Sequence, residues 1–185
     1  MIKLLGISGS LRRASYNSAL LSAATRLMPP EAQLAVASIR GIPLYDADVE
    51  AQGLPAAVSE LKEAVVAAAG VLLVTPEYNN GIPGVFKNTI DWLSRPNTDA
   101  RRVFAGRPFA VMGASPGGGG TTLSQTAWLP VLRTLGTQFW SGGRLQVSRA
   151  ATVFDEAGNL KDPGVEQQLK QFLAGYVAFV RRAAA

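Results

Sequence analysis

Three short polar or glycine-rich stretches carry residue types that suit ligand binding, and each of them follows an apolar run. They are GSLRRASYNS at 9–18, PEYNNGIP at 76–83 and SPGGGGTT at 115–122. The first offers hydroxyls, a side-chain amide and two guanidinium groups ahead of a helical pattern. Hydroxyl and guanidinium donors at a helix N-terminus are suited to a phosphate. We therefore interpret the first stretch as an anion-binding turn.

The donors of this turn favour a terminal phosphate over a pyrophosphate. The turn lacks the G-x-G-x-x-G spacing of dinucleotide folds and the G-K-[ST] of a P-loop. A phosphate monoester carries about two negative charges and three acceptor oxygens, so it can use many donors. The side chains available to it are Ser10, Arg12, Ser15, Asn17 and Ser18. In the alternative interpretation, Ser15 or Asn17 only caps the helix and the arginines are solvated.

The second and third stretches suit a flat heteroaromatic ligand. Tyr78 supplies an apolar face, Asn79 and nearby backbone groups can pair with a ring edge, and a helix N-terminus follows. The glycines at 117–120 allow a planar molecule to approach the backbone closely. The alternatives are an ordinary strand-to-helix turn, a flexible surface loop and, for Glu77, a subunit contact or a salt bridge.

Alternating strand and helix patterns predict where these stretches lie. We expect strands at Lys3–Ser8, Gln33–Ile39, Val71–Thr75 and Pro108–Ala114, and one between Thr137 and Val147 that Gly142 and Gly143 interrupt. Helices are expected over 17–28, 55–69, 84–93, 123–135 and 164–182. The run VLLVT at 71–75 is typical of a strand buried on both faces of a parallel sheet.

This alternation predicts an α/β fold, a flavodoxin-like three-layer sandwich with a five-stranded parallel sheet of order 2-1-3-4-5 and helices on both faces. Ligands of such sheets bind outside the carboxyl ends of the strands. The three stretches all follow strands, so we expect them to converge on one crevice. The length of 185 residues fits a single domain over 1–185.

Composition excludes several classes of function. The chain has no cysteine and no histidine, which removes disulfides, thiolate nucleophiles and the commonest metal ligands, and we expect no metal. The apolar run at 64–74 is too short for a membrane span and no cleavable signal is visible, so we expect a cytoplasmic protein. The net charge of +5 favours anionic ligands, but no motif of nucleic-acid binding accompanies it.

The sequence resembles the NAD(P)H-dependent FMN reductases of flavodoxin-like fold, which include chromate and quinone reductases and related azoreductases. The resemblance rests on GSLRRASYN at 9–17 and TPEYNNGIPGVFKNTIDWLSR at 75–95, and IPLYDADVE at 42–50 is also similar. It implies a single FMN-binding domain with NADPH or NADH as cosubstrate. It also implies ping-pong hydride transfer through FMN to quinones, flavins, azo compounds or chromate.

The resemblance implies roles for particular residues, all of them in binding because FMN carries the chemistry. Ser10, Arg12, Ser15, Asn17 and Ser18 would hold the phosphate, and Tyr16 of the same motif is also expected to bind the cofactor. Pro76, Glu77, Tyr78 and Asn79 would contact the isoalloxazine, and Ser115, Gly117 and Gly118 would line its other side. Arg13 is expected to point outward. The family forms homodimers and dimers of dimers, so we expect one of these assemblies.

Other interpretations stay open at this point. A flavodoxin-type electron carrier would bind FMN without its own reductase activity, although such carriers are usually acidic. A phosphatase of the same topology needs a cysteine that the chain lacks, and a flavin-free interaction module is a third possibility. Arg95, Arg101, Arg102 and Arg107 form a basic segment that can either meet a 2′-phosphate or be a solvated loop.

Overall fold

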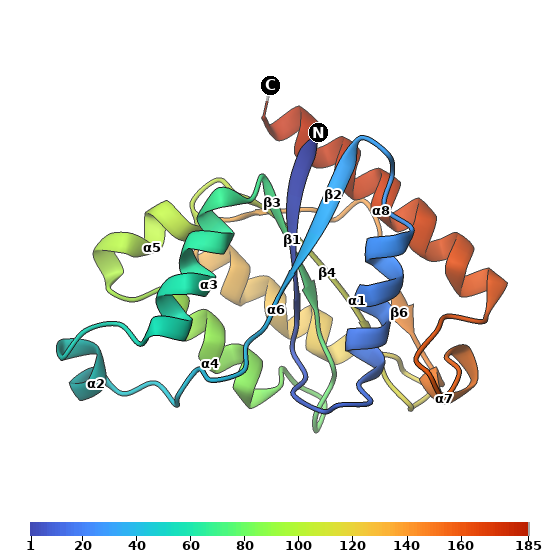
Figure 1. The fold of residues 1–185 in the computed structure, drawn as a ribbon, viewed down its shortest axis with the longest axis horizontal. Helices are drawn as coiled ribbons and strands as arrows, with labels where there is room; N and C mark the ends of the chain where they lie inside the picture. Colours follow the sequence, from blue (N-terminus) through green and yellow to red (C-terminus); the bar gives the residue numbers. More distant parts are fainter. Residues whose placement is uncertain (185) are drawn as a thin grey trace.

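The computed structural model describes residues 1–184 as a parallel sheet between two layers of helices (Figure 1). The strands run in the order β2-β1-β3-β4-β5, and β6 also pairs with β4. Their bounds are β1 (Ile2–Ser8), β2 (Ala32–Ala37), β3 (Gly70–Val74), β4 (Pro108–Ala114), β5 (Gln138–Phe139) and β6 (Gln146–Val147). The predicted fold class and strand order are confirmed.

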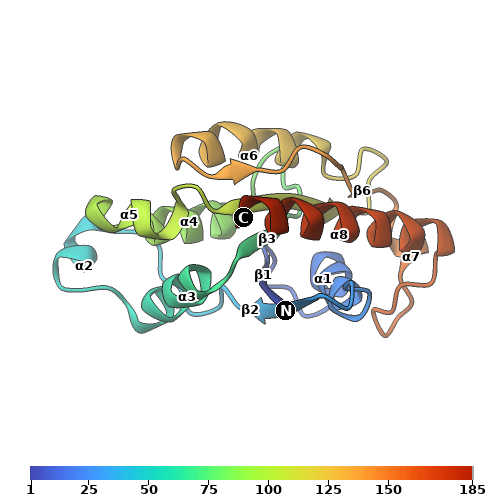
Figure 2. The ribbon, with the colours of Figure 1, turned by 90° about the horizontal axis from the view of Figure 1, so that it is seen from above.

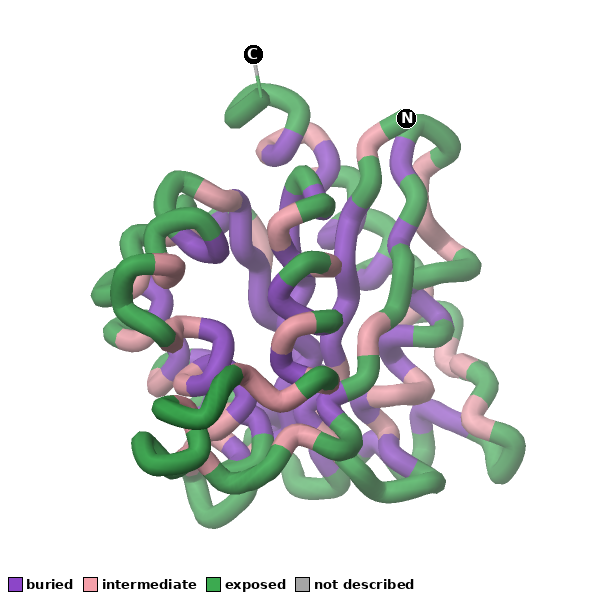
Figure 3. The backbone as a smooth tube through the Cα atoms, turned by 60° about the vertical axis from the view of Figure 1, so that its left-hand side comes forward, coloured by how far each residue is buried: buried purple, intermediate pink, exposed green. Residues whose placement is uncertain are grey.

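Alternate side chains of the strands pack into two cores, one on each face of the sheet. Leu72 and Val74 of β3 join the core beneath α1 and α8, whereas Val71 and Leu73 join the core on the opposite face. All five residues of β3 are buried, as the unbroken apolar run predicts. Figure 3 shows the strands as a buried centre inside more exposed helices and loops.

The helices lie close to their predicted positions. The main ones are α1 (Tyr16–Arg26), α3 (Ala56–Ala67), α4 (Gly84–Leu93), α6 (Thr122–Thr134) and α8 (Pro163–Ala183). Helices α1 and α8 cover one face of the sheet, and α3, α4 and α6 pack on the other (Figure 2). The short helices α2 (Ala47–Ala51), α5 (Asn97–Phe104) and α7 (Ala150–Val153) were not predicted.

The last strand region is split more completely than the sequence predicts. Each of β5 and β6 is two residues long, and the chain between them leaves the sheet. Trp140 turns its indole into the core, and a Cβ at Gly142 or Gly143 would lie 2.6 or 2.7 Å from that ring. The two glycines therefore let the backbone pass closely around the indole. Trp92 and Trp128 are also buried, so all three tryptophans pack in the core.

The segment from 95 to 107 is not the solvated loop that its charge suggests, because most of it forms α5. Arg102 pairs with Asp99 at 2.6 Å and with Glu63 at 2.7 Å. Arg107 donates to the carbonyl oxygens of Val103 and Ala68. These arginines are engaged within the chain near the amino ends of β3 and β4, away from the three stretches, which does not favour a role in binding a 2′-phosphate.

Within residues 1–184, no helix has the length and apolar character needed to cross a membrane. The same part of the chain has no group of three or more His, Cys, Asp or Glu side chains that could hold a metal ion.

Candidate functional site

Three loops lie together at the carboxyl edge of the sheet, at the lower edge of Figure 1. They are the first loop (residues 9–15), the second loop (75–83) and the third loop (115–121), which follow β1, β3 and β4. The N–H of Gly9 donates to the carbonyl of Val74 at 2.9 Å, and the N–H of Thr75 donates to that of Met112 at 2.8 Å. The structure thus brings the three predicted stretches side by side.

Asn17 joins the first turn of α1 to the start of the third loop. Its Oδ1 accepts from the N–H of Ala114 at 2.9 Å, and its Nδ2 donates to the carbonyl of Ala114 at 2.8 Å. The residue is only 4% exposed. Because buried backbone groups need partners, the Asn17 amide is committed to the end of β4. The structure therefore gives this side chain a positioning role, whereas the sequence assigned it to a phosphate.

Glu77 joins the second loop to helix α6. Its carboxylate accepts from the N–H groups of Leu123 and Ser124 at 2.8 and 2.9 Å. This places a negative charge at the helix N-terminus, where the macrodipole favours it. Thr75 adds a buried hydrogen bond to the Ser124 hydroxyl at 2.9 Å and accepts from Trp128 Nε1. The Glu77 carboxylate caps α6, a role outside the alternatives considered from sequence.

The first loop presents donors around the N-terminus of α1. Ser15 caps the helix, its Oγ accepting from the N–H of Ser18 at 3.2 Å. The N–H groups of Tyr16 and Asn17 have no hydrogen-bond partner within residues 1–184. Arg12 and Arg13 are exposed, and the outward position expected for Arg13 agrees with this. Free N–H groups at a helix N-terminus beside a guanidinium are suited to an anion.

The remaining serines of the motif make weak or shared contacts, so their hydroxyls stay able to bind a ligand. Ser10 Oγ accepts from the N–H of Arg12 at 3.4 Å, and Ser18 Oγ lies 3.1 Å from Ser8 Oγ. Both serines are partly exposed.

The Arg12 guanidinium packs over the ring of Tyr16. The guanidinium carbon of Arg12 lies 5.2 Å from the centre of the Tyr16 ring, and that ring stacks on Phe154 at 6.1 Å. A cation over an aromatic face is attracted to it. Sequence reasoning missed Phe154, since nothing in its local pattern indicates that it packs against the first helix.

The second loop holds an aromatic ring in an exposed, rigid turn. Tyr78 and Gly81 exchange backbone hydrogen bonds of 3.2 and 3.0 Å, and Asn79 and Asn80 have φ of 48° and 63°. Two consecutive positive φ values define a type I′ turn, and Asn tolerates that conformation well. Tyr78 is 49% exposed although its backbone is fixed. The ring and the Asn79 amide remain free to contact a ligand.

The third loop is open where its glycines lie. A Cβ at Gly118 or Gly119 would meet no atom within 4 Å, and neither residue has a positive φ. The chain's own packing therefore does not require glycine at these positions. The loop is nevertheless anchored, because the N–H of Arg149 donates to the Gly117 carbonyl at 3.0 Å and the Ser115 hydroxyl donates to the Gly120 carbonyl. Unobstructed backbone beside an exposed aromatic ring suits a planar ligand.

Comparison with known proteins identifies the family of the chain. Residues 2–152 match the family model described as NADPH-dependent FMN reductase. The chain belongs to this family. Members of the family are oxidoreductases that use FMN as cofactor and NADPH or NADH as cosubstrate, and this chain is one of them.

Individual relatives cover almost the whole chain. An NAD(P)H-dependent FMN reductase of Pseudomonas aeruginosa is 43% identical, over 98% of this chain and 96% of the relative. A 2-hydroxy-1,4-benzoquinone reductase of a Burkholderia species is 33% identical, over 97% of each chain. The solved structure of a flavoenzyme NAD(P)H:(acceptor) oxidoreductase from Paracoccus denitrificans superposes with a TM-score of 0.89, at 30% identity and with 99% of each chain covered.

The residues of the three loops fit FMN. The donors of the first loop match a phosphate monoester, Tyr78 offers a surface to a ring, and the open backbone at Gly118 leaves space for one. Three different loops thus provide what a phosphate-bearing planar cofactor needs.

Proposed function

We propose that the protein is an NAD(P)H-dependent quinone reductase that also reduces free flavins and azo compounds, with FMN bound between the three loops. The observation that carries the proposal is the meeting of free N–H donors, an exposed tyrosine and open glycine backbone at one edge of the sheet. When bound, FMN supplies the hydride chemistry between nicotinamide and acceptor. The names of the quinone-reducing relatives support quinones as acceptors.

The side chains then have binding and positioning roles. Arg12, the hydroxyls of the first loop and the free N–H groups of α1 hold the phosphate. The ring is contacted by the second loop, through Pro76, Tyr78 and Asn79, and by the third loop, through Ser115, Gly117 and Gly118. Helix α4 begins at Gly84, directly after the second loop, so its N-terminus favours negative charge on the ring. Asn17 and Glu77 keep the loops in place.

We also infer that a second copy of the chain completes the site. Exposed apolar side chains lie in the second loop (Tyr78), in α4 (Val85) and in the segment that bonds to α4 (Leu44). A homodimer or a dimer of dimers would cover them. Light scattering on the purified protein tests this, and a monomer with full reductase activity would contradict it. We place the enzyme in the cytoplasm, where reduced pyridine nucleotide is regenerated.

The activity can be tested directly on the purified protein. We expect FMN uptake, rapid bleaching of the flavin absorbance on mixing with NADPH or NADH, and turnover with benzoquinone, free FMN and an azo dye. FMN uptake without reduction by either nucleotide would indicate an electron carrier instead. A protein that takes up no FMN would contradict the proposal altogether.

A double variant tests the phosphate assignment. Arg12→Ala with Ser15→Ala removes a charged and a neutral donor, together about 3 kcal/mol or roughly 100-fold in the FMN dissociation constant. Ser15 also caps α1, so the unfolding free energy of the flavin-free variant should fall by about 1 kcal/mol. Arg182→Ala removes an exposed charge far along the chain and is the control. Unchanged FMN affinity in the double variant would refute the assignment.

A further inference from the structure

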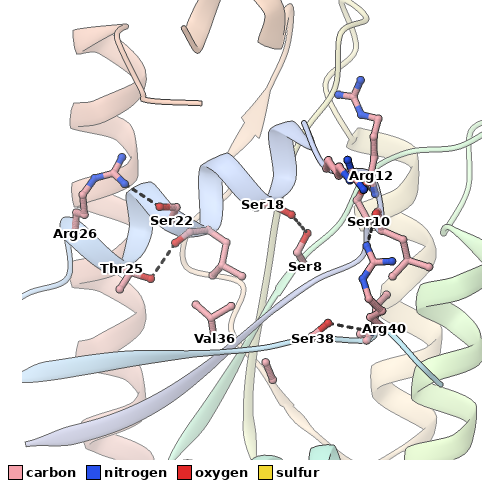
Figure 4. A pocket seen from close by; sticks show the side chains of 15 residues that line it. Ser8, Ser10, Arg12, Ser18, Ser22, Thr25, Arg26, Val36, Ser38 and Arg40 are labelled. Carbon is pink, nitrogen blue, oxygen red and sulfur yellow. Dashed lines mark hydrogen bonds between the residues drawn. The ribbon is translucent and has the colours of Figure 1, made fainter. Parts of the chain in front are cut away.

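A groove runs along helix α1 on the side that faces β2 (Figure 4). It has a volume of about 580 Å³ and extends from the first loop to Arg26 in the last turn of the helix. Ser18 and Arg26 both line it, and they lie about 12 Å apart along the helix axis at about 1.5 Å per residue. The groove therefore continues well beyond the phosphate-binding turn.

The groove and the proposed flavin site meet at the first loop, where Ser10, Arg12 and Ser18 line both, and they extend from it in opposite directions. In the order β2-β1-β3-β4, the loop after β1 has the groove on its β2 side and the second and third loops on its other side. A cofactor with its phosphate on the first loop and its ring between Tyr78 and Gly118 extends away from β2. The proposed FMN site thus uses the first-loop end of the groove and leaves free the part that runs along α1 to Arg26.

The rim of the groove carries four arginines and no acidic side chain, and three of the arginines remain when Arg12 holds the FMN phosphate. Arg12, Arg13, Arg26 and Arg40 line it, and none of its fifteen lining residues is Asp or Glu. Arg40 donates to the Leu11 carbonyl at 2.8 Å, and Arg26 donates to the Ser22 hydroxyl at 2.8 Å. Among residues 1–184, no salt bridge involves any of these four arginines. An anion is the ligand that such a rim attracts.

The floor of the groove is apolar. Leu21 of α1 and Ile39 after β2 line it, and Val36 of the edge strand is 59% exposed there. Ser22 and Ser38 add hydroxyls to the lining, beside Arg26 and Arg40 respectively. The volume falls within the range of about 300–1,000 Å³ that small-molecule sites occupy. A flat, weakly polar body that carries phosphate fits both the floor and the rim.

The geometry points to a second nucleotide site in this groove, which takes a phosphate ester of adenosine beside the FMN. Two sources have this chemistry. One is the adenosine phosphate half of the pyridine nucleotide cosubstrate, an assignment that rests on the proposed function. The other is a separate nucleotide that binds independently of the reaction.

Calorimetry on the FMN-saturated protein at physiological salt tests the site, with adenosine 2′,5′-bisphosphate as the probe. We expect saturable binding of one equivalent, weakened about fivefold or more by Arg26→Ala, because a guanidinium bound to phosphate forms charge-assisted hydrogen bonds. Arg26→Glu should weaken it further, and Arg182→Ala should leave it unchanged. Arg26 lies outside the flavin site, so reductase activity with saturating NADH should not change in these variants.

Three outcomes would overturn the site: no saturable binding, equal binding of uncharged adenosine, or an equal loss in Arg26→Ala and Arg182→Ala. Competition between the bisphosphate and NADPH in steady-state kinetics would identify the cosubstrate as the source. Binding without competition would identify a separate nucleotide. The titration can be repeated on flavin-free protein, so failure of the proposed function and failure of the groove site give different results.

Discussion

The two ends of the sheet differ in whether their polar groups have partners within the chain. At the amino end, Tyr176 is fully buried and its hydroxyl lies 2.9 and 3.0 Å from the carbonyl oxygens of Val71 and Pro108. Burial raises the pKa of this tyrosine well above its usual value, so it stays a neutral hydrogen-bond donor. Nearby, Lys62, Asp99, Arg102 and Glu63 neutralise one another. These polar groups find their partners within the chain.

At the carboxyl end, several hydrogen-bond donors have no partner in the described part of the chain and part of the backbone is unobstructed. The N–H groups of Tyr16 and Asn17 have no partner within residues 1–184, Arg12 meets no carboxylate there, and the backbone around Gly118 is open. N–H groups in the first turn of a helix need partners from outside the helix, and an anion can supply them. The contrast indicates that polar groups at the amino end stabilise the fold, whereas the carboxyl end leaves groups available to a ligand. Substitutions at the two ends should therefore change different quantities.

The largest effect is expected at the amino end, from Asp99→Ala. Lys62 is 1% exposed and its ammonium lies 3.0 Å from Asp99, so the variant leaves a buried charge without its counterion. We expect the unfolding free energy to fall by about 3 kcal/mol, measured by urea unfolding of the flavin-free protein. The double variant Lys62→Met with Asp99→Ala should recover most of the loss. A loss that the double variant does not recover would contradict this account.

The matching change at the carboxyl end is Arg12→Ala. It should raise the FMN dissociation constant by about 30-fold, equivalent to about 2 kcal/mol for a charge-assisted hydrogen bond. Stability without flavin should stay within about 0.5 kcal/mol, because the side chain is exposed. Fluorescence titration with FMN and urea unfolding measure the two quantities. If the Arg12→Ala variant loses stability but keeps its FMN affinity, the proposed difference between the two ends is wrong.

Two glycines, one at each end of the sheet, test the same comparison with smaller expected effects. A Cβ at Gly70 would lie 2.7 Å from the Tyr176 hydroxyl and 2.9 Å from Val180, whereas one at Gly118 meets nothing. Gly70→Ala should destabilise the protein by about 1–3 kcal/mol through overpacking. Gly118→Ala should leave stability unchanged or slightly raised, yet weaken FMN binding about tenfold if the ring lies against this backbone. Unaltered FMN affinity in Gly118→Ala would remove the third loop from the site.

The fold and the location of the site could be predicted from sequence because both follow from local patterns. The run at 71–75 identified the central strand, and the bounds of α4 and β4 agree with the prediction. The polar stretches were found because they follow those strands. The assignments to FMN of individual residues in these loops remain predictions.

The departures come from contacts between residues that are distant in the sequence. The Asn17 amide has the right chemistry for a phosphate, and only the fold shows that it pairs with Ala114. The basic segment around Arg102 looks solvated until α5 packs beside α3 and brings Glu63 to it. Arg40 could not be placed near the first loop from sequence, because it reaches Leu11 only through the pairing of β2 with β1.

The smallest effect concerns the pH dependence of the amino-end network. Hydrogen bonding to Arg102, with further help from Lys62, lowers the pKa of Asp99 from 3.8 to about 2. A carboxyl group whose pKa is depressed in the folded state stabilises the protein above its unfolded pKa, and that stabilisation is lost as the pH falls through the folded value. The stability difference between the wild type and Asp99→Asn should be constant above pH 5 and narrow between pH 4 and 2. Urea unfolding of flavin-free protein across this range measures it. A difference that persists undiminished at pH 2.5 would show that Asp99 acts through packing or hydrogen bonding alone, and not through its charge.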